Sequence, residues 1–215
     1  MQGNLDDEYN PVICPYPQLF FRGLGYMGKI LLGVICLENI RAKTVATIAS
    51  ILKLHPEANL MIKQGCYLHK NREEVALEAV TGQYDYLFFI DADMCFSAQV
   101  LDRLLKADKE IVGANYNQRH LPPISTMKME DSEGNLVARS GVMPKELFKV
   151  HALGTGCLLI KVSVLNKINR PWFWYGDAIN QVGEDVHFCR QAKKAGIDIW
   201  CEPNIEVGHI GEMVY

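Results

Sequence analysis

The sequence predicts an α/β domain built on a Rossmann-like, mostly parallel nucleotide-binding sheet that is flanked by helices. Apolar runs of strand length alternate with segments of helical apolar spacing between residues 29 and 116. The run ILLGVICL (30–37) is apolar throughout, as in a strand covered on both faces. Successive strand–helix pairs imply right-handed crossovers, and therefore a parallel sheet.

The elements of residues 29–116 follow in order. Four apolar segments predict strands, at residues 30–37, 59–65, 86–90 and 110–116. Three segments of helical spacing lie between them, at residues 45–52, 71–82 and 100–105. Asn71 is expected to open the second helix, Gly82 to close it, and Ser97 to cap the third. We expect these residues to form a nucleotide-binding half.

Residues 117–215 are predicted to be a less regular half of the same domain. Pro122-Pro123 and the turn residues 131–135 predict a polar insertion with a hairpin over 117–150. Later segments predict strands at 153–162, 197–203 and 205–211, helices at 163–168 and 183–195, and an aromatic loop at 171–181. Residues 1–28 lack any period and predict an irregular N-terminal arm, which leaves 29–215 as a single domain.

Composition excludes several classes of partner. The net charge of −3 and the pI of about 6.1 argue against binding of nucleic acid or an anionic membrane. No apolar run reaches the about 18–20 residues of a membrane span. Seven scattered cysteines without a C-x-x-C pair argue against a zinc site and a disulfide framework. These features predict a soluble, cytoplasmic protein.

Two carboxylates, Asp91 and Asp93, follow the buried strand YLFFI (86–90). Eleven aspartates in the chain give about half of one D-x-D by chance, so the motif alone is weak. Its place strengthens it, because ligands of open parallel sheets bind at the carboxyl ends of the strands. Divalent cations bridging phosphates are often held by one or two carboxylates. The alternative is a turn or helix-capping pair.

A second acidic pair, Glu184-Asp185, follows Gly183 at the predicted start of a helix. A carboxylate beside a cleft can act as a general base toward an attacking hydroxyl. The alternative is a favourable charge at a helix N-terminus, worth about 1 kcal/mol.

Two basic residues complete the candidates. Arg72, near a predicted helix start, is a candidate for binding a diphosphate, or else it pairs with Glu73 or Glu74. His209 lies in the glycine-flanked segment EVGHIG and is either a ligand or a structural residue. Aromatic residues that form core or an acceptor wall precede the acidic pair, at Trp172, Trp174 and Tyr175.

Taken in order, these segments resemble a metal-dependent glycosyltransferase of the GT-A fold, of the family 2-like type. The likeness lies in HKNREEVALEAVTGQYDYLFFIDADM (69–94), LGTGCLLIKVSVLNKI (153–168) and PWFWYGDAINQVGEDVHFCRQAKKAGIDIWCEPNIEVGHIG (171–211). It covers about residues 29–211, and it rests on the order and spacing of four individually weak motifs. The chain departs from the pattern at Cys36–Asn39, where a proline and a polar turn are usual, and at Asn71, which precedes rather than follows Arg72.

The resemblance implies Mn²⁺ or Mg²⁺ as cofactor, bound by Asp93 and His209. Asp91 would contact the ribose of the donor, or the metal through water. Asp185 would be the base of an inverting transfer, and Glu184 beside it would orient or contact the acceptor.

The resemblance also implies the remaining contacts of a nucleotide-sugar donor such as a UDP- or GDP-sugar. Arg72 would lie in the donor cleft, and Leu37 and Asn39 would contact the nucleobase. The segment Gly154, Thr155 and Gly156 would line the sugar pocket. The second half, 117–215, would be the acceptor side, receiving a carbohydrate or another hydroxyl compound.

Alternative functions remain open at this point. A retaining transferase of the same fold shares the D-x-D and the late histidine. A non-catalytic nucleotide- or carbohydrate-binding module would bind without turnover. A sugar-nucleotide pyrophosphorylase would need a glycine-rich loop after the first strand, where CLENIRAK has none. A dehalogenase-like phosphatase is disfavoured because two strand–helix units precede the D-x-D.

Overall fold

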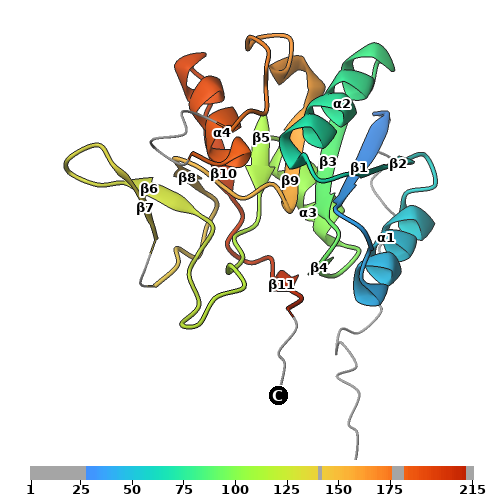
Figure 1. Cartoon of the computed structure of the whole chain (residues 1–215), viewed down its shortest axis with the longest axis horizontal. Coiled ribbons are helices and arrows are strands. Elements are labelled where there is room, and N and C mark those ends of the chain that lie inside the picture. The colour runs from blue at the N-terminus through green and yellow to red at the C-terminus, as the bar shows by residue number, and fades with distance from the viewer. Residues whose placement is uncertain (1–27, 140–141, 176–181, 212–215) are drawn as a thin grey trace, which may run out of the picture.

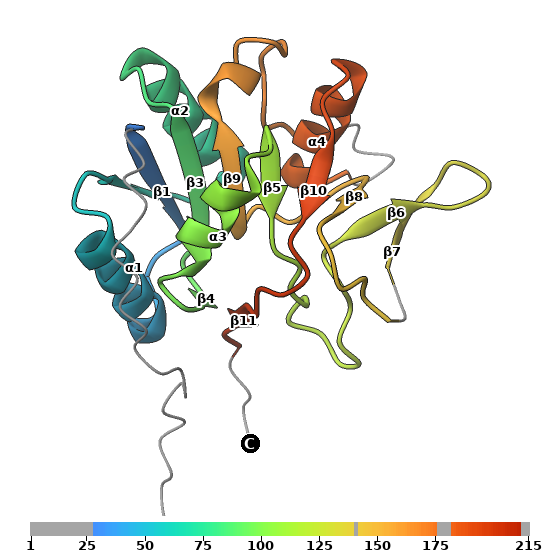
Figure 2. The same ribbon diagram turned by 180° about the vertical axis from the view of Figure 1, so that it is seen from behind.

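A seven-stranded sheet with helices on both faces forms the centre of the molecule (Figures 1 and 2). The computed structural model describes residues 28–139, 142–175 and 182–211. The predicted N-terminal arm, 1–28, therefore lies outside the described residues except for Gly28, and so does the second part of the predicted aromatic loop.

The strand order of the sheet is β2-β1-β3-β9-β5-β10-β8. Five strands run in one direction: β1 (Ile30–Cys36), β2 (Asn59–Gln64), β3 (Tyr86–Asp91), β5 (Ile111–Gly113) and β10 (Ile199–Cys201). The antiparallel strands are β9 (Cys157–Lys161) and β8 (Phe148–Val150). The predicted mostly parallel α/β sheet flanked by helices is thereby confirmed.

Each face of the sheet has its own apolar core. The helices are α1 (Ala42–Leu54), α2 (Leu68–Thr81), α3 (Val100–Ala107) and α4 (Glu184–Lys194). Helices α2 and α4 pack on one face, where Val75 and Phe188 meet Phe89 in a common cluster. Helices α1 and α3 cover the other face with Ile51 and Leu104. Strand β1 is buried along its whole length, as its unbroken apolar run predicts.

Two short ribbons lie outside the main sheet. Strands β6 (Lys128–Glu130) and β7 (Leu136–Ala138) form a hairpin, which confirms the hairpin predicted within 117–150. Strands β4 (Met94–Cys95) and β11 (Gly208–His209) pair antiparallel below the sheet in Figure 1. This second ribbon brings the C-terminal histidine beside the D-x-D.

Two helix starts differ from the prediction. Helix α2 begins at Leu68 rather than Asn71, because the Asn71 backbone N–H already donates to the Tyr67 carbonyl and its side chain donates to Gly65. Arg72 therefore lies one turn into the helix. Ser97 does not cap α3, since its carbonyl rather than its hydroxyl accepts the Val100 N–H.

Several strands are shorter than predicted. The segment 153–162 enters the sheet only at Cys157 and runs antiparallel, because the connection 117–156 contains no crossover helix among its described residues. The predicted helix 163–168 is a single 3₁₀ turn, η1 (Val162–Val164). The strands predicted at 110–116, 197–203 and 205–211 shorten to β5, β10 and β11.

Within the described ranges, no helix is long and apolar enough to cross a membrane. The six cysteines of these ranges are all free thiols, and four of them are buried.

Helix α2 lies close against β1 because Gly33 has no side chain. A Cβ placed on Gly33 would stand 2.5 Å from Val75 Cγ1 and 3.3 Å from Phe89 Cδ1. Val75 is fully buried and lies one turn after Arg72. This contact therefore limits how closely the turn of α2 that carries Arg72 can approach the sheet.

We expect Gly33→Ala to lower the free energy of unfolding by about 1–3 kcal/mol, because the added methyl overpacks a closed contact. Urea denaturation measures the loss. In the double variant Gly33→Ala/Val75→Ala the two losses should be less than additive, since the smaller residue 75 admits the new methyl. Strict additivity would show that this contact does not limit the approach of α2.

Candidate functional site

Asp91 and Asp93 lie at the carboxyl edge of the parallel strands, where the sequence predicts a site. The buried run of β3 ends at Asp91, and Asp93 follows in a tight turn. The side chains take different partners. Asp91 Oδ1 accepts a hydrogen bond from Arg72, whereas Asp93 Oδ2 lies 3.3 Å from both His209 Nε2 and Arg119 Nη1.

Arg72 joins three elements through its guanidinium. Its Nη2 donates to Asp91 Oδ1 at 2.7 Å, and its Nε donates to Glu184 Oε1 at 3.2 Å. The residue is only 3% exposed. Burial alone would lower the pKa of Arg72, but the two carboxylates raise it above its usual value. Nη1 is enclosed and has no partner in the described part of the chain, so this N–H group faces inward without a protein acceptor.

The two carboxylates at the start of α4 differ: Glu184 has an ion-pair partner, whereas Asp185 has none among the described residues. Glu184 is buried and bound to Arg72. Asp185 is half-buried, and its Oδ1 accepts the Val186 N–H at 2.7 Å. Burial, followed by the charge of Glu184, raises the pKa of Asp185 to about 6. A carboxyl with this pKa exchanges a proton near neutral pH, as general acid–base chemistry requires.

The late histidine is held against the D-x-D by backbone pairing. His209 stands opposite Met94 in the β4–β11 ribbon, and the Ile210 N–H donates to the Asp93 carbonyl at 2.8 Å. His209 Nδ1 lies 2.8 Å from the Asn117 carbonyl, so this nitrogen carries the proton and donates to that oxygen. Nε2 then points toward Asp93. The hydrogen bond to Asp93 raises the pKa of His209.

The chemistry of this donor set fits a divalent cation only in part. Among the described residues, no group of three or more histidine, cysteine, aspartate or glutamate side chains is placed to hold a metal ion. Asp93 and His209 offer two donors at adjacent positions, while Asp91 is engaged by Arg72. Two protein ligands suffice where a substrate diphosphate supplies further oxygens. Asp93 and His209 therefore fit a metal that is bound together with a nucleotide.

The segment Gly154–Gly156 is buried and packs against Tyr116, a residue that the sequence analysis did not single out. The Gly156 N–H donates to the Tyr116 hydroxyl at 2.9 Å. A Cβ on Gly154 would collide with that hydroxyl, and one on Gly156 would stand 2.9 Å from Asp91 Oδ2. The absence of side chains here admits Tyr116 beside Asp91. Thr155 is 2% exposed, so its side chain is enclosed rather than open to a cleft.

Tyr116 closes the site from the direction of β5. Its ring meets that of His209 edge-on, with 5.5 Å between the centroids. Burial, and then the nearby charge of Asp91, raises the pKa of Tyr116 well above its usual value, so the phenol stays neutral. The only sequence signal for it was its position at the end of a predicted strand.

The predicted nucleobase contacts lie at the same edge of the sheet. Leu37 and Asn39 follow β1, whose residue Ile35 stands opposite Asp91 in the register. Both are exposed, and Leu37 is 57% exposed. An exposed leucine at this edge of the sheet is available to a flat ligand.

The aromatic residues before α4 divide into core and surface. Trp172 is buried, and its indole N–H donates to the Leu165 and Ile168 carbonyls. Trp174 and Tyr175 are about half exposed and contact His69 of α2 edge-on. Of these three aromatic residues, only Trp174 and Tyr175 are exposed enough to form part of a ligand-binding wall.

Comparisons with known proteins match the fold and not the sequence. No family model matches the chain, and no curated protein matches it. A solved structure, that of A197 from STIV, is similar with a TM-score of 0.61 over 86% of each chain and 20% sequence identity. At this identity the similarity concerns the fold alone, a mixed α/β sheet flanked by helices.

Replacing Arg72 with methionine should cost about 3–5 kcal/mol of stability, because Asp91 and Glu184 would remain in the site without their buried counter-charge. Urea denaturation at neutral pH measures the loss. Arg170→Met is the matched control: this exposed arginine pairs with Glu73, and its loss should cost at most about 1 kcal/mol. Equal losses in the two variants would contradict a special role for the Arg72 network.

Proposed function

We propose that the chain is a metal-dependent glycosyltransferase of the GT-A type, transferring a sugar from a nucleotide-sugar donor to an acceptor hydroxyl with inversion. The observation that carries the proposal is the unpaired carboxylate of Asp185, with a pKa of about 6, beside the Arg72–Asp91–Glu184 network. The two proposed metal ligands, Asp93 and His209, lie close together at the same edge of the sheet.

Each part of the site has a task in this proposal. Asp93 and His209 hold Mn²⁺ or Mg²⁺ together with the diphosphate of a UDP- or GDP-sugar. When bound, the metal neutralises the charge of the departing nucleoside diphosphate. Asp91 contacts the ribose. The hydrogen bond from Arg72 keeps the Asp91 carboxylate oriented. Leu37 and Asn39 contact the base.

Asp185 takes the proton of the attacking acceptor hydroxyl. Glu184 is already paired with Arg72, which leaves Asp185 as the carboxylate of the pair that is free to accept a proton. Burial, and then the charge of Glu184, raise the pKa of Asp185 to about 6, so that Asp185 is a stronger base than an exposed aspartate and is still ionised at neutral pH. The acceptor then attacks from the α4 side.

Asp185→Asn should lower turnover by roughly 10²-fold or more while leaving nucleotide binding intact, because it removes the base without altering shape. In the wild-type protein, activity should rise with pH through about 6, as Asp185 loses its proton. Product formation from a panel of nucleotide sugars measures both effects. Asp198→Asn, a surface change at a residue paired with Lys149, is the matched control. Wild-type turnover in Asp185→Asn would refute the base assignment.

The same variant should also change the pH dependence of stability. The pKa of Asp185 is raised in the folded protein, so its contribution is full below pH 4 and is lost as the pH rises through about 6. Asp185→Asn should therefore be more stable than the wild type above that pH by up to about 3 kcal/mol, and equal to it in acid. Thermal denaturation against pH measures this. A variant of lower stability at every pH would show that ionised Asp185 is not desolvated.

Metal-dependent nucleotide binding provides a separate test of Asp93 and His209. Addition of UDP or GDP should raise the melting temperature only when Mn²⁺ is present. Asp93→Ala and His209→Ala should each abolish this rise, whereas His151→Ala, on a histidine paired with Glu130, should keep it. A nucleotide shift that needs no metal and persists in both variants would favour a non-catalytic binding module.

A further inference from the structure

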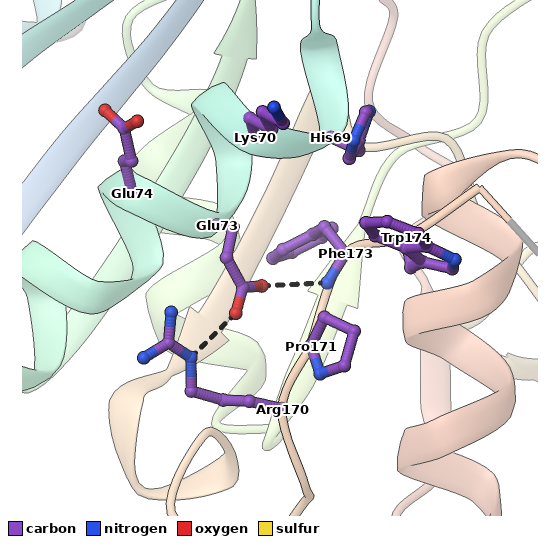
Figure 3. Close-up of a pocket in the computed structure, with 8 residues that line it drawn as sticks. All are labelled: His69, Lys70, Glu73, Glu74, Arg170, Pro171, Phe173 and Trp174. Carbon is purple, nitrogen blue, oxygen red and sulfur yellow. Dashed lines mark hydrogen bonds and ion pairs between the residues drawn. The ribbon is translucent and has the colours of Figure 1, made fainter.

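An open pocket of about 470 Å³ lies between the first turns of α2 and the segment 170–174 (Figure 3). Its size falls within the range of small-molecule sites. One wall is formed by helical residues such as His69 and Lys70, and the other by the extended segment that carries Phe173 and Trp174. None of the proposed catalytic or metal-binding residues lines it.

The floor of the pocket is apolar and aromatic. Trp174 is 49% exposed, and its ring meets that of His69 edge-on with 5.2 Å between the centroids. Figure 3 shows the His69 ring above that of Trp174, with Phe173 beside Trp174 and Pro171 below. With this contact made, about half of the Trp174 surface is still exposed to a ligand. Flat aromatic faces bind the apolar face of a sugar ring.

Hydrogen-bond donors flank this aromatic floor. The Lys70 ammonium lies over the Tyr67 ring at 4.8 Å and has no carboxylate partner in the described ranges. Arg170 uses its Nε for Glu73 at 2.8 Å, which leaves the two terminal nitrogens of its guanidinium for other acceptors. An aromatic floor with charged donors at its rim is the chemistry that binds the hydroxyl groups of a carbohydrate.

The pocket wall is held rigidly. One carboxylate, that of Glu73, accepts hydrogen bonds from Arg170 and from the backbone N–H groups of Trp172 and Phe173, at 2.8, 2.9 and 3.1 Å. Figure 3 shows two of these contacts. Glu73 therefore fixes the extended segment against α2, and the wall exists before any ligand arrives.

The pocket and the proposed catalytic site are both built on helix α2. His69 and Arg72 lie one turn apart on α2, so the same helix serves both. Tyr175 bridges them: its ring lies 4.8 Å from that of His69, and its pKa is raised by burial and by the charges of Glu184 and Asp185. A molecule whose reacting end lies at Asp185 can thus extend past Tyr175 to Trp174.

We propose that this pocket is a subsite for a second sugar unit of the acceptor, which stacks on Trp174 and whose hydroxyl groups accept hydrogen bonds from Lys70 and Arg170. The acceptor is then an oligosaccharide or the end of a glycan chain, rather than a monosaccharide or a simple alcohol. This inference rests on the proposed glycosyltransferase function, because that function places the reacting hydroxyl at Asp185.

The probe is an array of immobilised neutral mono-, di- and oligosaccharides, read with the labelled full chain in the absence of metal and nucleotide. We expect binding to a subset of the oligosaccharides and none to the corresponding monosaccharides. Trp174→Ala should weaken the binding of the best glycan by about tenfold, as expected for the loss of one stacking anchor. Trp174→Phe should retain most of it. Because Trp174 is exposed, neither change should lower the melting temperature appreciably.

A second comparison tests the polar rim. Lys70→Gln should weaken glycan binding several-fold, whereas Lys53→Gln, at an exposed lysine in the last turn of α1, should not. Tryptophan fluorescence gives an independent measure in solution: the change caused by the best free oligosaccharide should be largely lost in Trp174→Phe, because Trp172 is buried and Trp200 lies in β10, away from the pocket lining. Absence of glycan binding by the wild type, or equal binding by Trp174→Ala, would overturn the proposal.

The outcome is distinguishable from a failure of the proposed function. Glycan binding at Trp174 without any metal-dependent nucleotide binding would keep the subsite and refute the transferase. Nucleotide binding and transfer to monosaccharides as efficient as to oligosaccharides, unchanged in Trp174→Ala, would keep the transferase and refute the subsite.

Discussion

The buried guanidinium of Arg72 is the interaction on which the site depends. It ties α2 to the end of β3 through Asp91 and to the start of α4 through Glu184, residues that lie 19 and 112 positions away in the chain. Removing such a cation from water is costly, and the two carboxylates together offset the cost. One side chain thereby links the end of β3 to both helices, and the third carboxylate, Asp185, has no ion-pair partner in the described ranges.

Glycine residues support this charge network, because their lack of a side chain lets other groups approach closely. Gly33 lets α2 approach β1, and Gly154 and Gly156 admit the Tyr116 hydroxyl next to Asp91. The neutral phenol excludes water from this side of the carboxylate without adding charge. Small residues at the edge of the sheet therefore act on the electrostatics of Asp91, because they determine which groups surround it. Close packing in the protein interior is therefore enough to explain why these positions are glycine.

Some features that depend only on residues close together in the sequence were predicted correctly. An apolar run ending in two aspartates places them at the edge of a parallel sheet, and both are there. The segment Gly183–Asp185 does begin a helix. The partners of these residues could not be predicted in the same way, because pairing of Arg72 with Glu184 depends on how α2 and α4 pack on one face of the sheet. Tyr116 was missed because its phenol acquires significance only through glycines that lie 40 residues later.

The same reasoning explains where the predicted strands were wrong. Hydrophobicity identifies the run at 153–162 but not its direction, since an apolar strand reads alike in either orientation. Its first four residues lie outside the ladder: Gly154 and Gly156 make room for Tyr116, and Leu153 belongs to the core on one face of the sheet. The late segment 205–211 was likewise predicted as a strand, whereas only Gly208–His209 pair, and they pair with β4 outside the main sheet.

The position of β9 also orders the assembly of the molecule during synthesis. Strands β3 and β5 do not touch: β9, made later, lies between them and pairs with both. A nascent chain that ends before residue 157 therefore holds a sheet with a gap at its centre, and the edges of that gap are apolar and unpaired. The ribosome must release most of the chain before the D-x-D has its neighbours. Until β9 is synthesised, the edges of β3 and β5 that will face it have no native partner, and such edges favour non-native pairing.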